Sequence, residues 1–110
     1  MIIRIWHGWT INGNADAYEN LLKTEIFKGI LEKEIPGFKG VQLLRRSAGE
    51  ENEFLTLMWF ESINAVKEFA GKDYTRAVVP DNARKLLKRF DEYSQHYEIK
   101  DTKAPCCIDE

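Results

Sequence analysis

The order of apolar and polar residues predicts alternating strands and helices along the chain. Residues 2–11 are rich in β-branched and aromatic side chains and end at Asn12-Gly13-Asn14, which is typical of a strand followed by a turn. A helix is predicted over residues 15–34, because apolar side chains recur every fourth residue at Tyr18, Leu22, Ile26 and Ile30. Gly29 favours a bend or an early end in this helix, and Pro36-Gly37 terminates it.

The second half of the chain predicts a hairpin, two short helices and a last strand. Residues 38–47 and 54–60 read as strands joined by a short turn. Ser62 caps a helix that ends before Gly71, and Asp81 caps another whose apolar side is Leu86, Leu87 and Phe90. Residues 91–99 predict the final strand, so the domain covers 1–99, and 100–110 form a flexible tail.

This order predicts an α+β fold, the ferredoxin-like βαββαβ sandwich with a four-stranded antiparallel sheet. In the first strand we assign the odd positions, His7 among them, to the face that the helices cover. The other face would then be bare, with Trp6, Leu57 and Trp59 on it. A bare apolar face favours a partner, so we expect a homodimer joined sheet to sheet.

Composition narrows the class of protein. The 110 residues are 44% apolar, and sixteen basic against eighteen acidic residues give a formal charge of −2. This near-neutral balance does not predict a basic surface for binding nucleic acid. The longest stretch without charged residues, 5–15, is too short to span a membrane, and the chain starts with a strand and not a signal peptide. We therefore expect a single cytoplasmic domain that binds neither nucleic acid nor membrane.

The chain resembles the antibiotic biosynthesis monooxygenase superfamily, the dimeric α+β barrels. The resemblance covers residues 1–99, and its carriers are Arg4-Ile5-Trp6-His7-Gly8, Pro36-Gly37-Phe38-Lys39-Gly40-Val41, Leu44-Arg45-Arg46, Phe60-Glu61-Ser62 with Ala65, Phe69-Ala70-Gly71, and His96-Tyr97-Glu98. It implies a dimeric α+β barrel with one of two chemistries. One is oxygenation of quinols or polyphenols without a cofactor, and the other is oxidative degradation of haem.

The resemblance also implies pocket positions. His7, Phe60 and Val79 stand where haem-degrading members carry an asparagine, a tryptophan and the histidine that ligates iron. Valine has no donor atom for iron, which argues against haem degradation. We expect no cofactor.

His7 is the first catalytic candidate, because an imidazole can take a phenolic proton near neutral pH. The plain alternative is a core histidine with a satisfied N–H. We expect Phe60 and Trp9 to stack on a planar ring of the substrate. The alternative is that they only pack in the core. Tyr74, as a hydrogen-bond donor, and Arg76, as a residue that binds an anion, lie in a lid-like segment that also contains Val79. The alternative is a solvent-facing arginine and a half-buried tyrosine.

The remaining candidate residues are a second histidine and a pair of cysteines, and no catalytic role is predicted for them. The second histidine, His96, is assigned to the dimer side of the sheet, opposite to His7, and two histidines on opposite faces predict no metal site. The pair Cys106-Cys107 lies in the tail and is interpreted as an ordinary tail sequence. The sequence therefore predicts a cofactor-independent monooxygenase for a small electron-rich aromatic. The alternatives are a non-catalytic ligand-binding dimer of the same fold and a haem-binding protein.

Overall fold

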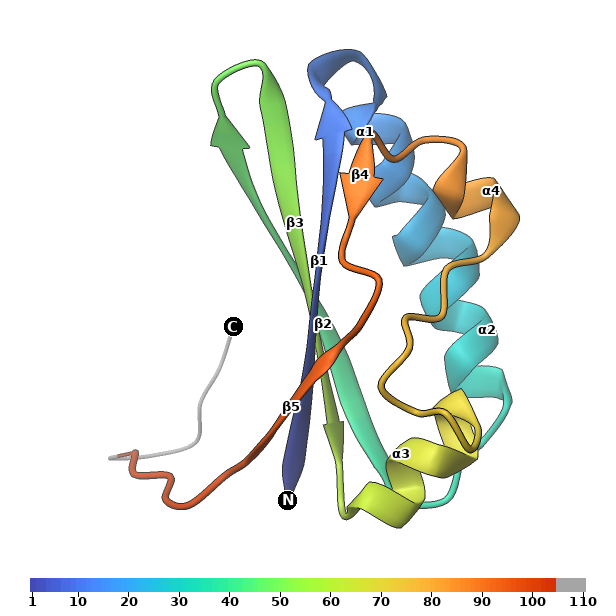
Figure 1. The fold of residues 1–110 in the computed structure, drawn as a ribbon, viewed down its shortest axis with the longest axis vertical. Helices are drawn as coiled ribbons and strands as arrows, with labels where there is room; N and C mark the ends of the chain where they lie inside the picture. Colours follow the sequence, from blue (N-terminus) through green and yellow to red (C-terminus); the bar gives the residue numbers. More distant parts are fainter. Residues whose placement is uncertain (105–110) are drawn as a thin grey trace.

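The computed structural model describes residues 1–104, and an antiparallel sheet forms its centre. Its strands are β1 (Ile2–Ile11), β2 (Phe38–Ala48), β3 (Glu51–Phe60), β4 (Arg89–Phe90) and β5 (Gln95–Glu98). The strand order is β2-β3-β1-β4, and β5 pairs with β1 on the same side as β4. Of the predicted last strand, 91–99, only residues 95–98 form a strand, β5, and β4 lies just before the predicted range. The sheet therefore has five strands and not the predicted four, and the ferredoxin-like α+β fold is confirmed (Figure 1).

The helix predicted over 15–34 is present as one helical segment with a wider turn inside it. It consists of α1 (Asn12–Leu21), the π-helical η1 (Leu22–Ile26) and α2 (Phe27–Glu32). The Phe27 N–H bonds to the Leu22 carbonyl, five residues earlier. Gly29 lies inside α2 and does not end the helix.

The shorter helices agree with the sequence only in part. The helix α3 (Ile63–Ala70) begins as predicted, with the Ala65 N–H donating to Ser62 Oγ at 3.2 Å. The helix α4 (Asp81–Arg84) is a single turn capped by Pro80, so the longer helix capped by Asp81 is wrong. The chain leaves α4 early because Lys88 N–H donates to the Trp9 carbonyl at 2.7 Å, and Phe90 pairs with Gly8 of β1.

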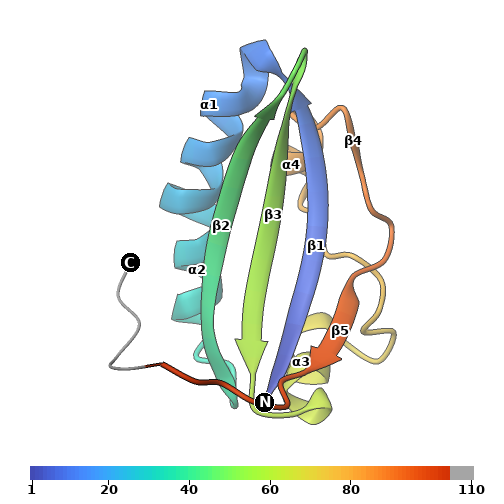
Figure 2. The ribbon, with the colours of Figure 1, turned by 90° about the vertical axis from the view of Figure 1, so that its left-hand side faces the viewer.

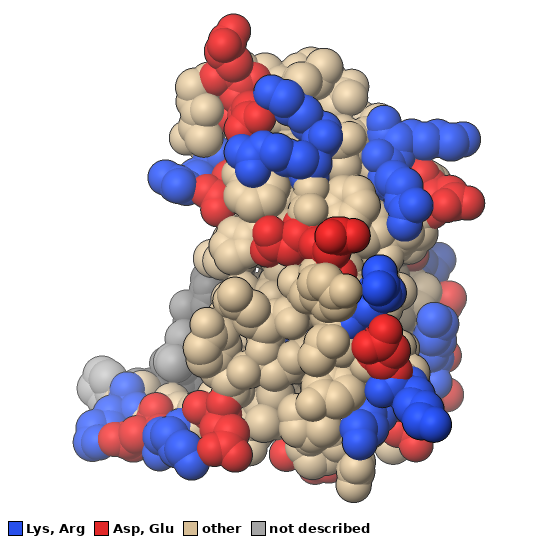
Figure 3. All heavy atoms as spheres, in the orientation of Figure 1, with Lys and Arg blue, Asp and Glu red and all other residues tan. Residues whose placement is uncertain are grey.

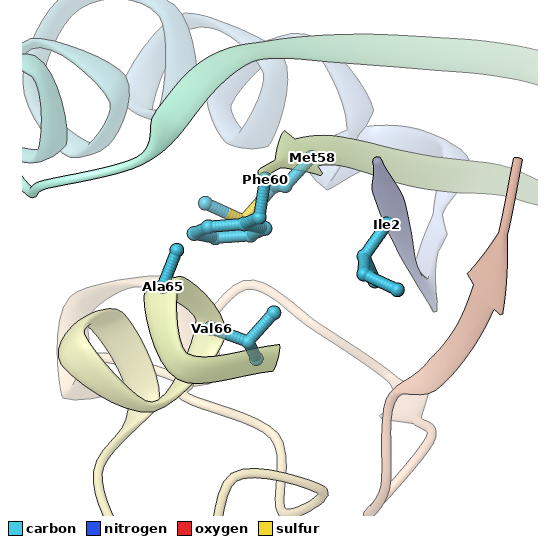
Figure 4. Packing of buried hydrophobic residues seen from close by; sticks show 5 residues of the cluster. All are labelled: Ile2, Met58, Phe60, Ala65 and Val66. Carbon is cyan, nitrogen blue, oxygen red and sulfur yellow. The ribbon is translucent and has the colours of Figure 1, made fainter. Parts of the chain in front are cut away.

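All helices lie against one face of the sheet, and the other face is uncovered (Figures 1 and 2). One core cluster joins the sheet to α3 and contains Ile2, Met58, Phe60, Ala65 and Val66 (Figure 4). A second joins the sheet to α1 and α4 and contains Ala15, Tyr18, Leu22, Phe54 and Ala83. Phe60 and Phe54 are both fully buried, so these two strand residues are central to the packing.

The assignment of the faces of β1 is wrong. Ile2, Arg4, Gly8 and Thr10 are buried toward the helices, whereas His7 and the other odd positions point to the uncovered face. A Cβ on Gly8 would lie 3.0 Å from both Leu87 Cδ2 and Trp6 Cη2. The even-numbered face of β1 therefore carries Gly8, whose lack of a side chain lets Leu87 and Trp6 approach the strand.

Among residues 1–104, none of the helices has both the length and the apolar character needed to cross a lipid bilayer.

Candidate functional site

A cavity of about 70 Å³ lies between the sheet and the helices. Its floor is β1 and β3, its wall is the segment from α1 to α2, and residues 78–80 and α4 close it from above. The lining is mostly apolar and consists of Arg4, Trp6, Tyr18, Leu22, Ile26, Phe27, Ile30, Thr56, Met58, Phe69, Val78, Val79, Pro80, Ala83 and Ser94. The π-helical turn contributes to this wall through Leu22 and Ile26.

Arg4 is the charged residue of the lining, and it is almost fully buried, with 3% of its surface exposed. Its Nη1 donates to the Tyr74 carbonyl at 2.5 Å, and its Nη2 donates to the Arg76 carbonyl at 3.2 Å. Its guanidinium also lies 5.5 Å from the centre of the Phe69 ring. Burial lowers the pKa of Arg4 to about 10, so the group stays charged at neutral pH.

His96 lies beside Arg4, on the helix-facing side of the sheet and not on the dimer side that we predicted. Its Nε2 is 2.9 Å from Arg4 Nη1. Arginine can only donate, so Nε2 is the acceptor and the neutral ring carries its proton on Nδ1. Burial, and then the Arg4 charge, lower the pKa of His96, so a neutral imidazole faces the guanidinium.

Hydroxyl groups supply the other polar contacts of the lining. Tyr18 is 1% exposed, and its ring meets Phe54 edge-on at 4.8 Å. Burial raises the pKa of Tyr18, so its hydroxyl remains protonated and can donate a hydrogen bond. Ser94 and Thr56 add two further hydroxyl-bearing side chains.

Of the segment 71–80, predicted as a lid, only the last three residues, Val78, Val79 and Pro80, line the cavity. The backbone of the segment is fixed to the sheet edge, because Ser94 N–H donates to the Thr75 carbonyl at 2.6 Å and Ala77 N–H to the Glu92 carbonyl at 2.8 Å. Neither Tyr74 nor Arg76 lines the cavity, and their roles toward a ligand stay predictions. Their backbone carbonyls hold Arg4.

The Arg76 guanidinium points elsewhere, to Asp73 at 3.5 Å and to the Tyr93 ring at 5.2 Å. The Tyr74 ring packs edge-on against His96 at 5.2 Å. On the face that Figure 3 shows, Lys and Arg side chains gather near β4, and further charged side chains of both signs lie over α3 and the segment that follows it.

His7 and Trp9 lie across the sheet from the cavity, on the uncovered face. His7 Nδ1 is 3.0 Å from Asp91 Oδ2, and its Nε2 is 3.8 Å from Glu53 Oε2. Its ring stacks on Trp9 at 5.8 Å, and the Arg89 guanidinium covers Trp9 at 4.0 Å. The catalytic role of His7 and the ring-binding role of Trp9 stay predictions, but the cleft that motivated them lies on the other face.

Phe60 belongs to the core beside the cavity and not to its lining. It packs on Phe38 at 5.5 Å and on Phe69 at 5.9 Å. Arg4 and Trp6 were missed as site residues. The sequence does contain a signal for Arg4, which is a charged residue at an alternate position of an otherwise apolar strand. Trp6 lies two residues further on the same face.

The lining does not fit haem. Val79 has no donor atom, and neither an imidazole nor a thiolate lines the cavity in residues 1–104. The lining does contain the phenol of Tyr18, which burial keeps protonated, and the thioether of Met58, which ligates haem iron in partnership with a histidine. Together with an adjoining groove of about 220 Å³ along α2, the cavity of about 70 Å³ has room for one small aromatic, for which about 150 Å³ suffices, but not for a porphyrin. In the same part of the chain, no group of three or more His, Cys, Asp or Glu side chains is placed to hold a metal ion. Cys106-Cys107 lies outside the described residues.

Comparison with known proteins shows likeness in structure. No protein-family model matches the chain, and none of the curated proteins matches it. Among solved structures, a Bacillus cereus protein described as an antibiotic biosynthesis monooxygenase matches with a TM-score of 0.67 at 19% identity, over 94% of this chain and 96% of that one. SnoaB, a cofactor-independent oxygenase from Streptomyces nogalater, matches with a TM-score of 0.59 at 14% identity, over 92% and 95%.

The haem degrader MhuD from Mycobacterium tuberculosis is also similar, with a TM-score of 0.57 at 21% identity, over 94% of this chain and 100% of that one. These likenesses extend along nearly the whole of each chain. The chain therefore has the ferredoxin-like α+β fold of antibiotic biosynthesis monooxygenase-like proteins, as the resemblance predicted.

Proposed function

We propose that the chain is a cofactor-independent monooxygenase that oxidises a small electron-rich aromatic of the phenol or quinol type in the cavity between sheet and helices. The observation that carries the proposal is the cavity itself, which combines apolar walls with hydroxyl donors and one buried cation. Planar rings with a polar substituent match such a lining. The likeness in fold to a cofactor-independent oxygenase supports the same reaction.

The reaction needs no bound cofactor when the substrate is itself the reductant. An ionised phenol passes one electron to dioxygen, which gives a substrate radical and superoxide. The two combine at a carbon that is a ring CH₂ in the keto form of the substrate, as in an anthrone, and the peroxide takes up a proton. Loss of water from the resulting hydroperoxide, CH–OOH, leaves a carbonyl at that carbon. One oxygen atom enters the product and the other leaves as water, so the electrons balance without a further donor. Apolar walls protect the radical pair from water.

Oxygen uptake tests this proposal. We expect the full chain to consume dioxygen with members of a panel of quinols and anthrones. A Val79→Phe variant fills the cavity and should slow the uptake by about tenfold or more, because the ring loses its space. The control is Leu31→Phe, which adds the same ring at a position that is 59% exposed and outside the cavity. Saturable binding without uptake would contradict the enzyme and indicate a ligand-binding protein of this fold.

We further propose that two chains pair through the uncovered sheet face. The apolar and aromatic side chains on this face come from β1, β2, β3 and β5 and are Ile3, Ile5, Leu44, Leu55, Leu57, Trp59 and Tyr97. Leu44 and Tyr97 are 42% and 53% exposed in the single chain. A contiguous apolar face of this kind favours association, since water contact with it is costly. Leu57 and Trp59 were predicted here, whereas Trp6 faces the cavity.

A further inference from the structure

We propose that Arg4 makes one end of the cavity an oxyanion site, so that the ligand is a planar aromatic bound as a phenolate or carboxylate on the guanidinium. This inference rests on the proposed function in one respect only, which is that the ligand occupies the same cavity. It adds the charge of the ligand and the residue that selects it.

The first support is that the Arg4 charge has no counter-ion in the part of the chain that the structure describes. None of the ion pairs formed within residues 1–104 includes Arg4. Its partners are two backbone carbonyls and the neutral ring of His96. A buried charge without an opposite charge is costly, and such groups in proteins are paired or bind an ion.

The second support is the number of donors that remain. A guanidinium has five N–H groups. Two on Nη1 reach Tyr74 and His96, and one on Nη2 reaches Arg76. The Nε–H and the second Nη2–H have no hydrogen-bond partner among the described residues. Nε and Nη2 form one edge of the guanidinium, the edge that suits two oxygens of a carboxylate or one phenolate oxygen.

The third support is that nothing else in the lining can supply the negative charge. Tyr18 remains protonated, and the other lining residues apart from Arg4 carry no charge. His96 engages its lone pair with Arg4. The cavity therefore has a net positive charge, and an anionic ligand would neutralise it.

Space for the ring comes from an adjoining groove of about 220 Å³ along α2. Cavity and groove share Ile26, Ile30, Phe69, Val78 and Pro80, so these side chains form the passage between them. An aromatic ring whose oxygen lies on Arg4 would extend through this passage. Lys33 and Glu25 also line the groove, and their charges are of opposite sign. Arg4 therefore supplies the charge at the inner end, where the groove meets the cavity.

The probe is 4-nitrophenol, whose phenolate has its own visible absorbance, and the full chain is titrated into it over a range of pH. An apolar cavity alone raises the pKa of a bound phenol, whereas a cation beside the oxygen lowers it. We expect the bound phenol to ionise at lower pH than the free phenol. We also expect Arg4→Met to weaken nitrophenolate binding by about tenfold or more, the effect of one charged hydrogen bond.

Matched controls isolate the charge. Nitrobenzene, the neutral ligand of the same shape, should bind Arg4→Met and the unchanged chain within about twofold, because both retain the apolar walls. Arg84→Met removes an arginine that is exposed on α4 and should leave nitrophenolate binding unchanged. Arg4→Lys should restore part of the binding, since it keeps the charge but loses the two-donor edge.

A raised pKa of the bound phenol, or no binding of nitrophenolate, would overturn the oxyanion site even if Arg4→Met failed to fold, because both are measured on the unchanged chain. The outcomes also separate the two proposals. Oxygen uptake that is unaffected by Arg4→Met would refute the oxyanion site and leave the monooxygenase. Nitrophenolate binding at Arg4 without uptake on any quinol would refute the monooxygenase and leave the site.

Discussion

Phe54→Ala is expected to lower the free energy of unfolding by about 3–5 kcal/mol, the usual cost of emptying the space of a buried phenylalanine. Phe54 is fully buried at the centre of β3. It meets the Tyr18 ring edge-on at 4.8 Å and carries the Arg45 guanidinium 5.5 Å above its own ring. Its loss separates the sheet from α1, so the stability of the whole domain should fall.

Urea unfolding followed by circular dichroism measures this effect at a fixed protein concentration. The control is Leu31→Ala on α2, where the side chain is 59% exposed and the change should cost less than about 1 kcal/mol. A loss below about 1 kcal/mol for Phe54→Ala would contradict the packing of the second core cluster.

Leu57→Arg is expected to convert the proposed dimer into monomers. Leu57 lies at the centre of the uncovered face, opposite Ile5 of β1 and Gln42 of β2. In a sheet-to-sheet dimer the symmetric copy would bring a second introduced guanidinium nearby, so two like charges would be buried in an apolar contact. Burying an unpaired charge costs several kcal/mol, which weakens the association by about a hundredfold or more.

Light scattering coupled to size-exclusion chromatography measures the mass in solution. Leu57→Met preserves the volume and the apolar character and should keep the dimer. Equal circular dichroism spectra for both variants would show that the fold is retained. A monomeric unchanged chain at all concentrations would refute the dimer directly.

The sequence predicts most of the elements of this fold because their signals are local. The Ser62 cap, the Pro36-Gly37 stop and the short turn before β3 each act within a few residues, and each is present. The helix from Asp81 fails because its end is decided by a distant partner. Lys88 and Phe90 pair with β1, and the pattern of apolar residues around α4 does not reveal this pairing.

The site was harder to predict because alternation gives two faces of a strand without saying which one the helices cover. Both faces of β1 carry bulky groups, and the choice is made by Gly8, whose missing side chain leaves room for Leu87 and Trp6. The prediction placed His7 in the cavity because it assigned the helices to the wrong one of the two faces of β1. That error also concealed Arg4, which lies three positions earlier on the other face.

Nuclear magnetic resonance of the tryptophan indole N–H groups tests most directly whether the cavity is the ligand site. Trp6 lines the cavity, whereas Trp9 and Trp59 lie on the opposite face of the sheet. The three signals are assigned with single Trp→Phe variants, and 4-nitrophenol is then titrated into the isotope-labelled full chain. We predict that the Trp6 signal shifts most. Saturable shifts of Trp9 or Trp59 with Trp6 unchanged would place the ligand on the uncovered face and contradict the account.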